Sequence, residues 1–155
     1  MKSSNATTNF GLHLTIDGYN GDATKLNSME HVFKVLDDLP SFLAMTKLIT
    51  PYVVAAPGND KKDPGGYSGF VMIQESHISV HTFPKRRFVS IDVYSCKNFD
   101  TGKTKEYLTK AFGLGECETN IIVRGTRYPT ENASRRGNGE KFTHPRGSLQ
   151  LQRRG

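Results

Sequence analysis

Short segments in which apolar and polar side chains alternate recur along this chain, and they restrict its fold more than any other feature. Residues 10–17 and 118–124 follow this pattern closely, and residues 67–74, 78–83 and 87–94 are also typical of strands. A period of two sends successive side chains to opposite faces of a β-strand. Fifteen glycines and seven prolines are available for the turns between such strands. The pattern predicts a strand-rich domain.

Two segments have the spacing of apolar residues that is typical of helices. Ser28 is suited to cap the first helix, which is expected to stop near Pro40, and residues 42–45 are a candidate for one further turn. The second helix is expected to begin at Asp100 or Thr101 and to end at a glycine shortly after its last apolar residue. The apolar positions are Met29, Val32, Phe33 and Leu36 in the first helix, and Tyr107, Leu108, Ala111 and Phe112 in the second.

The order of these elements is strand, helix, several strands, helix and strand. This order favours an α+β fold, a two-layer sandwich in which an antiparallel sheet has helices packed on one face. Residues 48–55 are strand-like but contain Pro51, so we expect them at an edge of the sheet. Residues 57–66 are predicted to form a loop because Gly, Pro, Asn and Asp are frequent there.

The net charge of +6 is concentrated at the C-terminal end of the chain. Residues 129–155 contain six basic residues and two glutamates, a net charge of +4, which leaves +2 for residues 1–128. Periodicity also ends there, so we expect one domain over 1–128 and a basic, mostly disordered tail over 129–155. The chain has no apolar run of membrane-spanning length and no apolar signal segment near Met1. These features predict a cytoplasmic protein without a membrane partner.

The two cysteines, Cys96 and Cys117, are expected to be reduced in such a protein. Cys117 lies between Glu116 and Glu118, whose negative charges oppose formation of a thiolate. We therefore interpret Cys117 as a packing residue. No Cys or His spacing typical of a zinc site occurs, and no metal is predicted.

Reactive side chains gather in the middle of the chain. Ser76 and His77 follow Glu75, His81 begins the run His-Thr-Phe-Pro, and Cys96 ends the next apolar segment. Their hydroxyl, imidazole and thiol groups are suited to nucleophilic and proton-transfer chemistry. Ser76 and His81 have opposite parity, so a regular strand would point them to opposite faces unless a turn or bulge lies near Ser76.

Together with Ser68 in the run Gly-Tyr-Ser-Gly, these motifs resemble the small prokaryotic S-adenosylmethionine decarboxylases. A weaker resemblance extends over residues 10–128 and includes Gly-Leu-His-Leu at 11–14 and Arg124-Gly125. It implies the α+β sandwich, a carboxy-lyase activity that supplies aminopropyl groups for spermidine synthesis, and a homodimer of cleaved protomers whose active sites draw on both chains.

The resemblance implies that Ser76 becomes a pyruvoyl group after the chain cuts itself between Glu75 and Ser76, giving fragments 1–75 and 76–155. Decarboxylation leaves a carbanion that no ordinary side chain delocalises. A pyruvoyl carbonyl provides the electron sink through a Schiff base with the substrate amine. The pyruvoyl group is therefore the expected cofactor, and the chain itself supplies it.

The resemblance also implies roles for the other matching residues. His81 is expected to promote processing, and Ser68 to support it. Cys96 is expected to return a proton to the substrate carbon after CO2 leaves. His77 belongs to the same motif without a definite role.

Two positions depart from the family pattern. Lys85 follows His-Thr-Phe-Pro directly, where the family commonly has an acidic residue that accepts hydrogen bonds from ribose. Lysine has donors only, and its charge opposes a cationic sulfonium. The segment before Ser68 lacks the aromatic residue that many members have for stacking on adenine, so Phe83 and Tyr67 are candidates for that contact. Phe83, Tyr67 and Lys85 are the predicted substrate-binding residues, although a solvated turn explains the basic run at 85–87 equally well.

Three alternatives stay open. The substrate could be ornithine or arginine, whose distal cation requires a carboxylate such as Asp63 or Asp17. The chain could also be a non-processing regulatory partner subunit, although such a subunit does not need the reactive residues. The basic tail could contact nucleic-acid phosphates, but Phe142 is its only aromatic residue, so we do not expect nucleic-acid binding.

Overall fold

The structure is a computed structural model that describes residues 9–59 and 62–128 of the chain. Its elements in chain order are β1 (Gly11–Tyr19), α1 (Ala23–Leu26), α2 (Met29–Phe42), β2 (Thr46–Lys47), β3 (Tyr52–Ala56), β4 (Gly66–Gln74), β5 (Ser76–Phe83), the 3-10 helix η1 (Pro84–Arg86), β6 (Phe88–Ser95), α3 (Thr101–Phe112) and β7 (Glu116–Arg124). The predicted basic tail over 129–155 lies outside the described residues.

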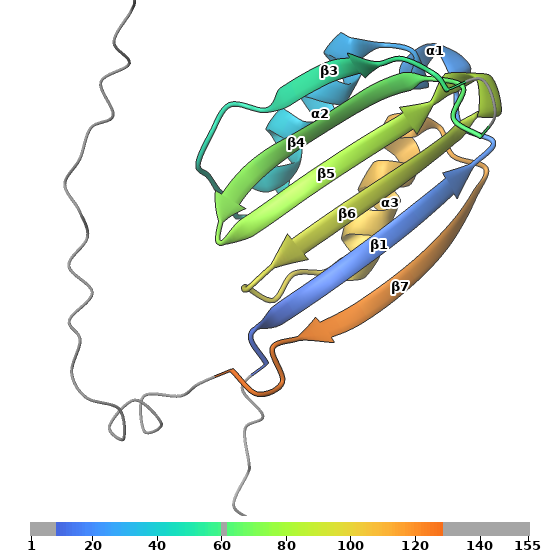
Figure 1. Cartoon of the computed structure of the whole chain (residues 1–155). Coiled ribbons are helices and arrows are strands. Elements are labelled where there is room, and N and C mark those ends of the chain that lie inside the picture. The colour runs from blue at the N-terminus through green and yellow to red at the C-terminus, as the bar shows by residue number, and fades with distance from the viewer. Residues whose placement is uncertain (1–8, 60–61, 129–155) are drawn as a thin grey trace, which may run out of the picture.

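The strands form one sheet, and every strand pair in the described residues is antiparallel. The sheet has seven strands in the order β2-β4-β5-β6-β1-β7, and β3 also pairs with β4. The helices α2 and α3 pack across one face, and no described helix covers the other, which is called the open face below (Figure 1). The predicted α+β sandwich is confirmed.

Alternation along the strands places a continuous apolar core between the sheet and the helices. Leu14 and Ile16 of β1 are each 1% exposed, and Ile78 and Val80 of β5 are fully buried. The helices contribute Val32, Leu36, Leu39, Leu108 and Phe112, all fully buried. Each large apolar side chain that is buried in this way contributes roughly 1.5–3 kcal/mol to stability. The polar partners in the alternation therefore lie on the open face.

Polar side chains cap both long helices at the predicted positions. The Ser28 hydroxyl accepts the amide hydrogen of His31 at the start of α2. The Asp100 carboxylate accepts the amide hydrogen of Lys103 at the start of α3. Gly113 ends α3 with a φ of 60°, a conformation that favours glycine.

The first helix ends near Pro40, as predicted, but Pro40 lies inside its last turn. The helix α2 continues to Phe42, and the amide of Leu43 donates to the Leu39 carbonyl in its last turn. Proline removes one backbone donor near the helix end, while its buried ring adds to the core. The packing of this turn outweighs the loss of that one hydrogen bond.

The short helix α1 has no counterpart among the predicted elements. Asp22 caps it by accepting hydrogen bonds from the amides of Lys25 and Thr24. These bonds, above all the one from Lys25, lower the pKa of Asp22. A four-residue helix is too short to show periodicity, so its cap is the only signal in the sequence.

Only the second half of the strand predicted over 48–55 is a strand, namely β3, and the two-residue strand β2 lies just before the predicted range. β2 and β3 each pair with β4 and with no other described strand, which confirms the predicted edge position. Pro51 lies between β2 and β3, where a residue without an amide hydrogen costs no ladder hydrogen bond.

Leu36→Ala should lower the free energy of unfolding by about 2–5 kcal/mol, because it leaves a cavity where a fully buried side chain packs between α2 and the sheet. Leu48→Ala is the matched control, because Leu48 is 53% exposed. Its expected change is below about 0.5 kcal/mol. Urea unfolding followed by circular dichroism measures both variants. Equal losses in the two would contradict this assignment of the core.

Candidate active site

Ser76 lies where β4 turns into β5. β4 ends at Gln74 and β5 begins at Ser76, so Glu75 alone connects the two strands. Ser76 has a φ of 129°, a conformation that residues with a side chain rarely adopt. Such a conformation stores about 1–3 kcal/mol of backbone strain. The turn therefore holds the peptide bond between Glu75 and Ser76 at an exposed, strained end of the sheet.

Backbone pairing brings Cys96 to this turn. Ser76 is opposite Ser95 of β6, and the Cys96 amide donates a hydrogen bond of 3.4 Å to the carbonyl oxygen of Glu75. The Cys96 thiol is free and half-buried. Gly11 lies against the same segment, since a Cβ at Gly11 would be 2.8 Å from the Cα of Cys96. The structure therefore places the predicted serine and cysteine together.

Ser68 and His81 form a second reactive pair at a distance from Ser76. They are opposite each other on β4 and β5, and Ser68 Oγ lies 2.9 Å from His81 Nδ1. His81 follows Ser76 by five residues along β5, which corresponds to about 17 Å in an extended strand. One protomer therefore carries Ser76 with Cys96 at one end of the sheet, and Ser68 with His81 toward the other end.

His81 lies on the open face, with His77, Ser79 and Phe83 of the same strand. The contact with Ser68 occupies only Nδ1 of its ring. In the part of the chain that the structure describes, Nε2 of His81 has no hydrogen-bond partner. This nitrogen is available for proton transfer to a group that approaches the open face.

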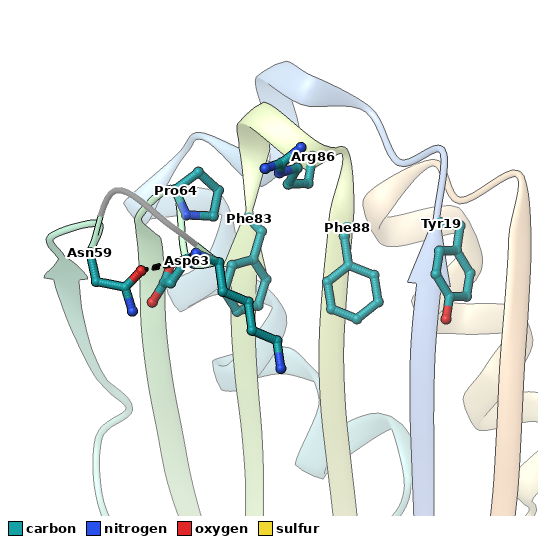
Figure 2. A pocket seen from close by; sticks show the side chains of 8 residues that line it. Tyr19, Asn59, Asp63, Pro64, Phe83, Arg86 and Phe88 are labelled. Carbon is teal, nitrogen blue, oxygen red and sulfur yellow. Dashed lines mark hydrogen bonds between the residues drawn. The ribbon is translucent and has the colours of Figure 1, made fainter.

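A cavity of about 520 Å³ opens on the same face beyond His81. Three aromatic side chains from adjacent strands line it, namely Phe83 of β5, Phe88 of β6 and Tyr19 of β1 (Figure 2). The ring centroids are 5.6 Å apart for Phe83 and Phe88, and 5.3 Å apart for Phe88 and Tyr19. The rest of the lining comes from Asn59, Lys62, Asp63, Pro64 and Arg86. We call this cavity the aromatic pocket.

Charges of both signs border the aromatic pocket. The Tyr19 hydroxyl donates to Glu118 at 2.9 Å, and this hydrogen bond is the main cause that raises the pKa of Tyr19. The Asp63 carboxylate accepts a backbone amide at 2.8 Å, while Lys62 and Arg86 add positive charge. The pocket is suited to a planar group with polar substituents at its edge.

The three basic residues after Pro84 have different surroundings. Arg87 donates from Nε and Nη2 to two carbonyl oxygens in the connection from β1 to α1, at 2.8 and 3.3 Å, which is a structural contact. Arg86 lines the aromatic pocket. Lys85 and Tyr67 instead line a separate cavity of about 330 Å³. Of the predicted substrate-binding residues, only Phe83 lies at the aromatic pocket.

Sequence reasoning missed Tyr19 and Phe88 as site residues. The alternation assigns each to a face, but it does not reveal which strands are neighbours. It also missed Tyr94 and Arg124, where the Arg124 guanidinium carbon lies 4.7 Å from the centre of the Tyr94 ring. No sequence motif indicates a contact between residues so far apart in the chain.

Over residues 9–59 and 62–128, no helix is long and apolar enough to cross a membrane. The same residues contain no cluster of three or more His, Cys, Asp or Glu side chains that could hold a metal ion.

Comparison with known proteins gives a consistent picture. The profile of the family described as S-adenosylmethionine decarboxylase matches residues 12–125. An S-adenosylmethionine decarboxylase proenzyme of Clostridium botulinum is 33% identical over 116 residues, which are 74% of this chain and 94% of that protein. A proenzyme of the same description from Sulfurihydrogenibium sp. is 31% identical. The match covers 74% of this chain and 82% of that protein.

The solved structures include a similar fold. The crystal structure of the adenosylmethionine decarboxylase from Aquifex aeolicus matches with a TM-score of 0.64 and 26% sequence identity, over 76% of this chain and 92% of that one. Sequence and fold therefore agree that this chain belongs to the S-adenosylmethionine decarboxylase family.

Proposed function

We propose that this chain is a proenzyme that cuts itself between Glu75 and Ser76 and then decarboxylates S-adenosylmethionine with the pyruvoyl group so formed. The observation that carries the proposal is the surroundings of the Glu75 carbonyl. Its carbon is attached to the nitrogen of Ser76, and its oxygen accepts the Cys96 amide. That hydrogen bond stabilises negative charge on the oxygen when a nucleophile attacks the carbon.

The self-cleavage balances with the residues present and one water molecule. Ser76 Oγ attacks the Glu75 carbonyl carbon, the amide bond breaks, and the hydroxyl proton passes to the nitrogen, which leaves an ester. A base then removes the Cα proton of Ser76, and the ester bond breaks so that Glu75 departs as a carboxylate. Water hydrolyses the resulting enamine, through its imine, to a keto acyl group and ammonia. The serine at position 76 fits this group because it starts a strand at an exposed turn.

A pyruvoyl group at position 76 would supply the electron sink for the carbanion that decarboxylation leaves. The backbone contact between Cys96 and Glu75 supports a role for the Cys96 thiol in returning a proton to the substrate carbon. The amide and the thiol of Cys96 then have separate tasks, the amide in self-cleavage and the thiol in turnover.

The distance between the two reactive pairs supports a homodimer with shared sites. His81 cannot reach Ser76 of its own chain across about 17 Å of strand. A second copy that packs against the open face could bring its Ser68 and His81 to this Ser76. Tyr52, Phe70 and Met72 are exposed large apolar residues of β3 and β4. Tyr52 and Phe70 lie opposite each other in the β3–β4 pair. Such an apolar surface is typical of a contact between copies.

The aromatic pocket supports a substrate with a planar ring. Phe83 and Phe88 offer faces on which adenine could stack, and the pocket lies on the same face as His81. Lys85 lies at the other cavity, so its charge does not line this pocket. S-adenosylmethionine is therefore the substrate that we propose.

One observation favours a second candidate, a basic amino acid such as ornithine or arginine. Asp63 lines the aromatic pocket, where its carboxylate could hold a distal cation. Asp17, the other carboxylate considered for this role, accepts the Ser90 hydroxyl at 2.9 Å and does not line that pocket. Lys62 and Arg86 oppose a distal cation held in this pocket, whereas S-adenosylmethionine would place its uncharged adenine there, and this difference places the basic amino acids second.

Ser76→Ala should abolish self-cleavage, because it removes the attacking hydroxyl. Ser79→Ala is the matched control on the same strand, and it should cleave like the unchanged chain. Denaturing electrophoresis of the purified proteins separates the whole chain from its two fragments. Cleavage of the Ser76→Ala chain at the same bond would contradict the proposed nucleophile.

His81→Ala alone should slow self-cleavage by about 10²–10⁴-fold, the usual contribution of a general acid or base. Co-expression with a Ser76→Ala chain should restore cleavage of the His81→Ala chain. In a mixed dimer, one site combines an intact Ser76 with an intact His81 from the other copy. Affinity tags of different length identify which chain is cut. Absence of rescue in a mixture that forms dimers would mean that each chain builds its site alone.

Decarboxylation assays should release CO2 from S-adenosylmethionine with a higher kcat/KM than from ornithine or arginine. Phe83→Leu should raise KM for S-adenosylmethionine, because it removes a stacking ring while keeping an apolar side chain. Asp63→Asn should leave that reaction nearly unchanged. The prediction is contradicted if CO2 is released only from ornithine or arginine and this activity is lost in Asp63→Asn. The second candidate would then be the substrate.

A further inference from the structure

We propose that Tyr94, held in place by Arg124, is a positioning residue for the attack of Ser76 on the Glu75 carbonyl. The inference rests on the proposed self-cleavage and adds two residues to it. Both lie on the open face near the turn, and neither is among the site residues predicted from the sequence.

Side chains from three strands surround the Tyr94 ring. The guanidinium carbon of Arg124 lies 4.7 Å from the ring centroid. The rings of His13 and His77 have centroids 5.4 and 5.9 Å from that of Tyr94, and the His77 contact is edge-to-face. Phe10 adds a tilted contact at 6.5 Å. We call these five residues the Tyr94 cluster.

The Tyr94 cluster reaches the chain on both sides of the bond to be cut. His77, which directly follows Ser76, pairs with Tyr94 in the β5–β6 register. Two residues beyond Tyr94, the Cys96 amide binds the Glu75 carbonyl oxygen. A ring that packs on His77 and belongs to the strand leading to Cys96 therefore fixes the nucleophile and the carbonyl relative to each other.

The hydrogen bonds of His13 fix Arg124 over the ring. Arg124 Nη1 lies 3.3 Å from His13 Nδ1, and arginine has donors only, so Nδ1 must accept. The proton of His13 is then on Nε2, which donates to Asp92 at 2.8 Å. With both nitrogens engaged, His13 connects Arg124 to Asp92 and is not free to act as a base. This chain of contacts crosses β7, β1 and β6.

The ring of Tyr94, not its hydroxyl, makes these contacts. Within the described residues, the Tyr94 hydroxyl has no hydrogen-bond partner, whereas the ring has four neighbours in the cluster. Tyr94→Phe therefore keeps the positioning surface, and Tyr94→Leu removes it. Arg124→Lys keeps a cation and donors over the ring, and Arg124→Met removes both while keeping a side chain of similar length.

The test is the rate of self-cleavage after synthesis in a cell-free system, followed by denaturing electrophoresis. Tyr94→Leu should cleave about tenfold more slowly and Arg124→Met about fivefold more slowly, as expected for lost aromatic and cation–π contacts. Tyr94→Phe and Arg124→Lys should cleave at close to the rate of the unchanged chain. Arg127→Met, at an exposed arginine in the turn after β7, controls for loss of charge and should also be unchanged.

Hydroxylamine identifies the step that is slowed, because it splits an ester between Glu75 and Ser76 but leaves the amide intact. The uncleaved Tyr94→Leu chain should resist hydroxylamine, because the slow step is the attack of Ser76 that forms the ester, and the bond to Glu75 is still an amide. Accumulation of a hydroxylamine-sensitive ester would overturn the proposal, because the cluster would then act on the later elimination. Equal cleavage rates in all variants would overturn it as well.

A stability measurement separates positioning from unfolding. In a Ser76→Ala background, which keeps the chain whole, Tyr94→Leu should lower the melting temperature much less than Leu36→Ala does. An equal loss would mean that the slow cleavage reflects general destabilisation, and the proposal would fall. If the unchanged chain itself stays whole, the proposed function fails and this inference with it. Normal cleavage of the unchanged chain and of every variant overturns this inference alone.

Discussion

The pairing of β5 between β4 and β6 is the constraint on which the rest of the site depends. The β4–β5 register places Ser68 opposite His81, and the β5–β6 register places Ser76 opposite Ser95. Successive side chains of a strand point to opposite faces, so a slip of one residue in the pairing would move all the open-face side chains of β5 into the core. The fully buried Ile78 and Val80 prevent that slip. The same apolar packing that stabilises the sheet therefore aligns its reactive residues.

Much of the fold was predictable because it depends on local patterns. Alternation revealed the five long strands, and Ser28 and Asp100 marked the starts of the two long helices. That α2 runs two residues past Pro40 was not fixed by the local pattern, because burial of a helix turn is a tertiary effect that outweighs one missing donor. The four-residue α1 was too short for any periodic signal.

The candidate site was only partly predictable. The motifs singled out Ser76, His81, Ser68 and Cys96, and the structure adds that Cys96 lies at the Ser76 turn and that Ser68 lies beside His81. The sequence could not reveal that the two pairs lie at different ends, because that follows from strand length and register together. Nor could it show that Arg124 and Tyr94 meet, since β7 and β6 are both neighbours of β1 and not of each other. The basic run after Pro84 was ambiguous in the sequence, and the structure gives each of its residues different surroundings.

The most direct test of the account is an intact mass spectrum of the purified full-length protein under denaturing, reducing conditions. The account predicts two polypeptides, 1–75 and 76–155. The second should begin with a pyruvoyl group. Its mass should therefore be lower, by the mass of one ammonia molecule, than that of the same fragment with an N-terminal serine. A single species with the mass of the uncut chain would contradict self-processing, and it would point to a non-processing partner subunit.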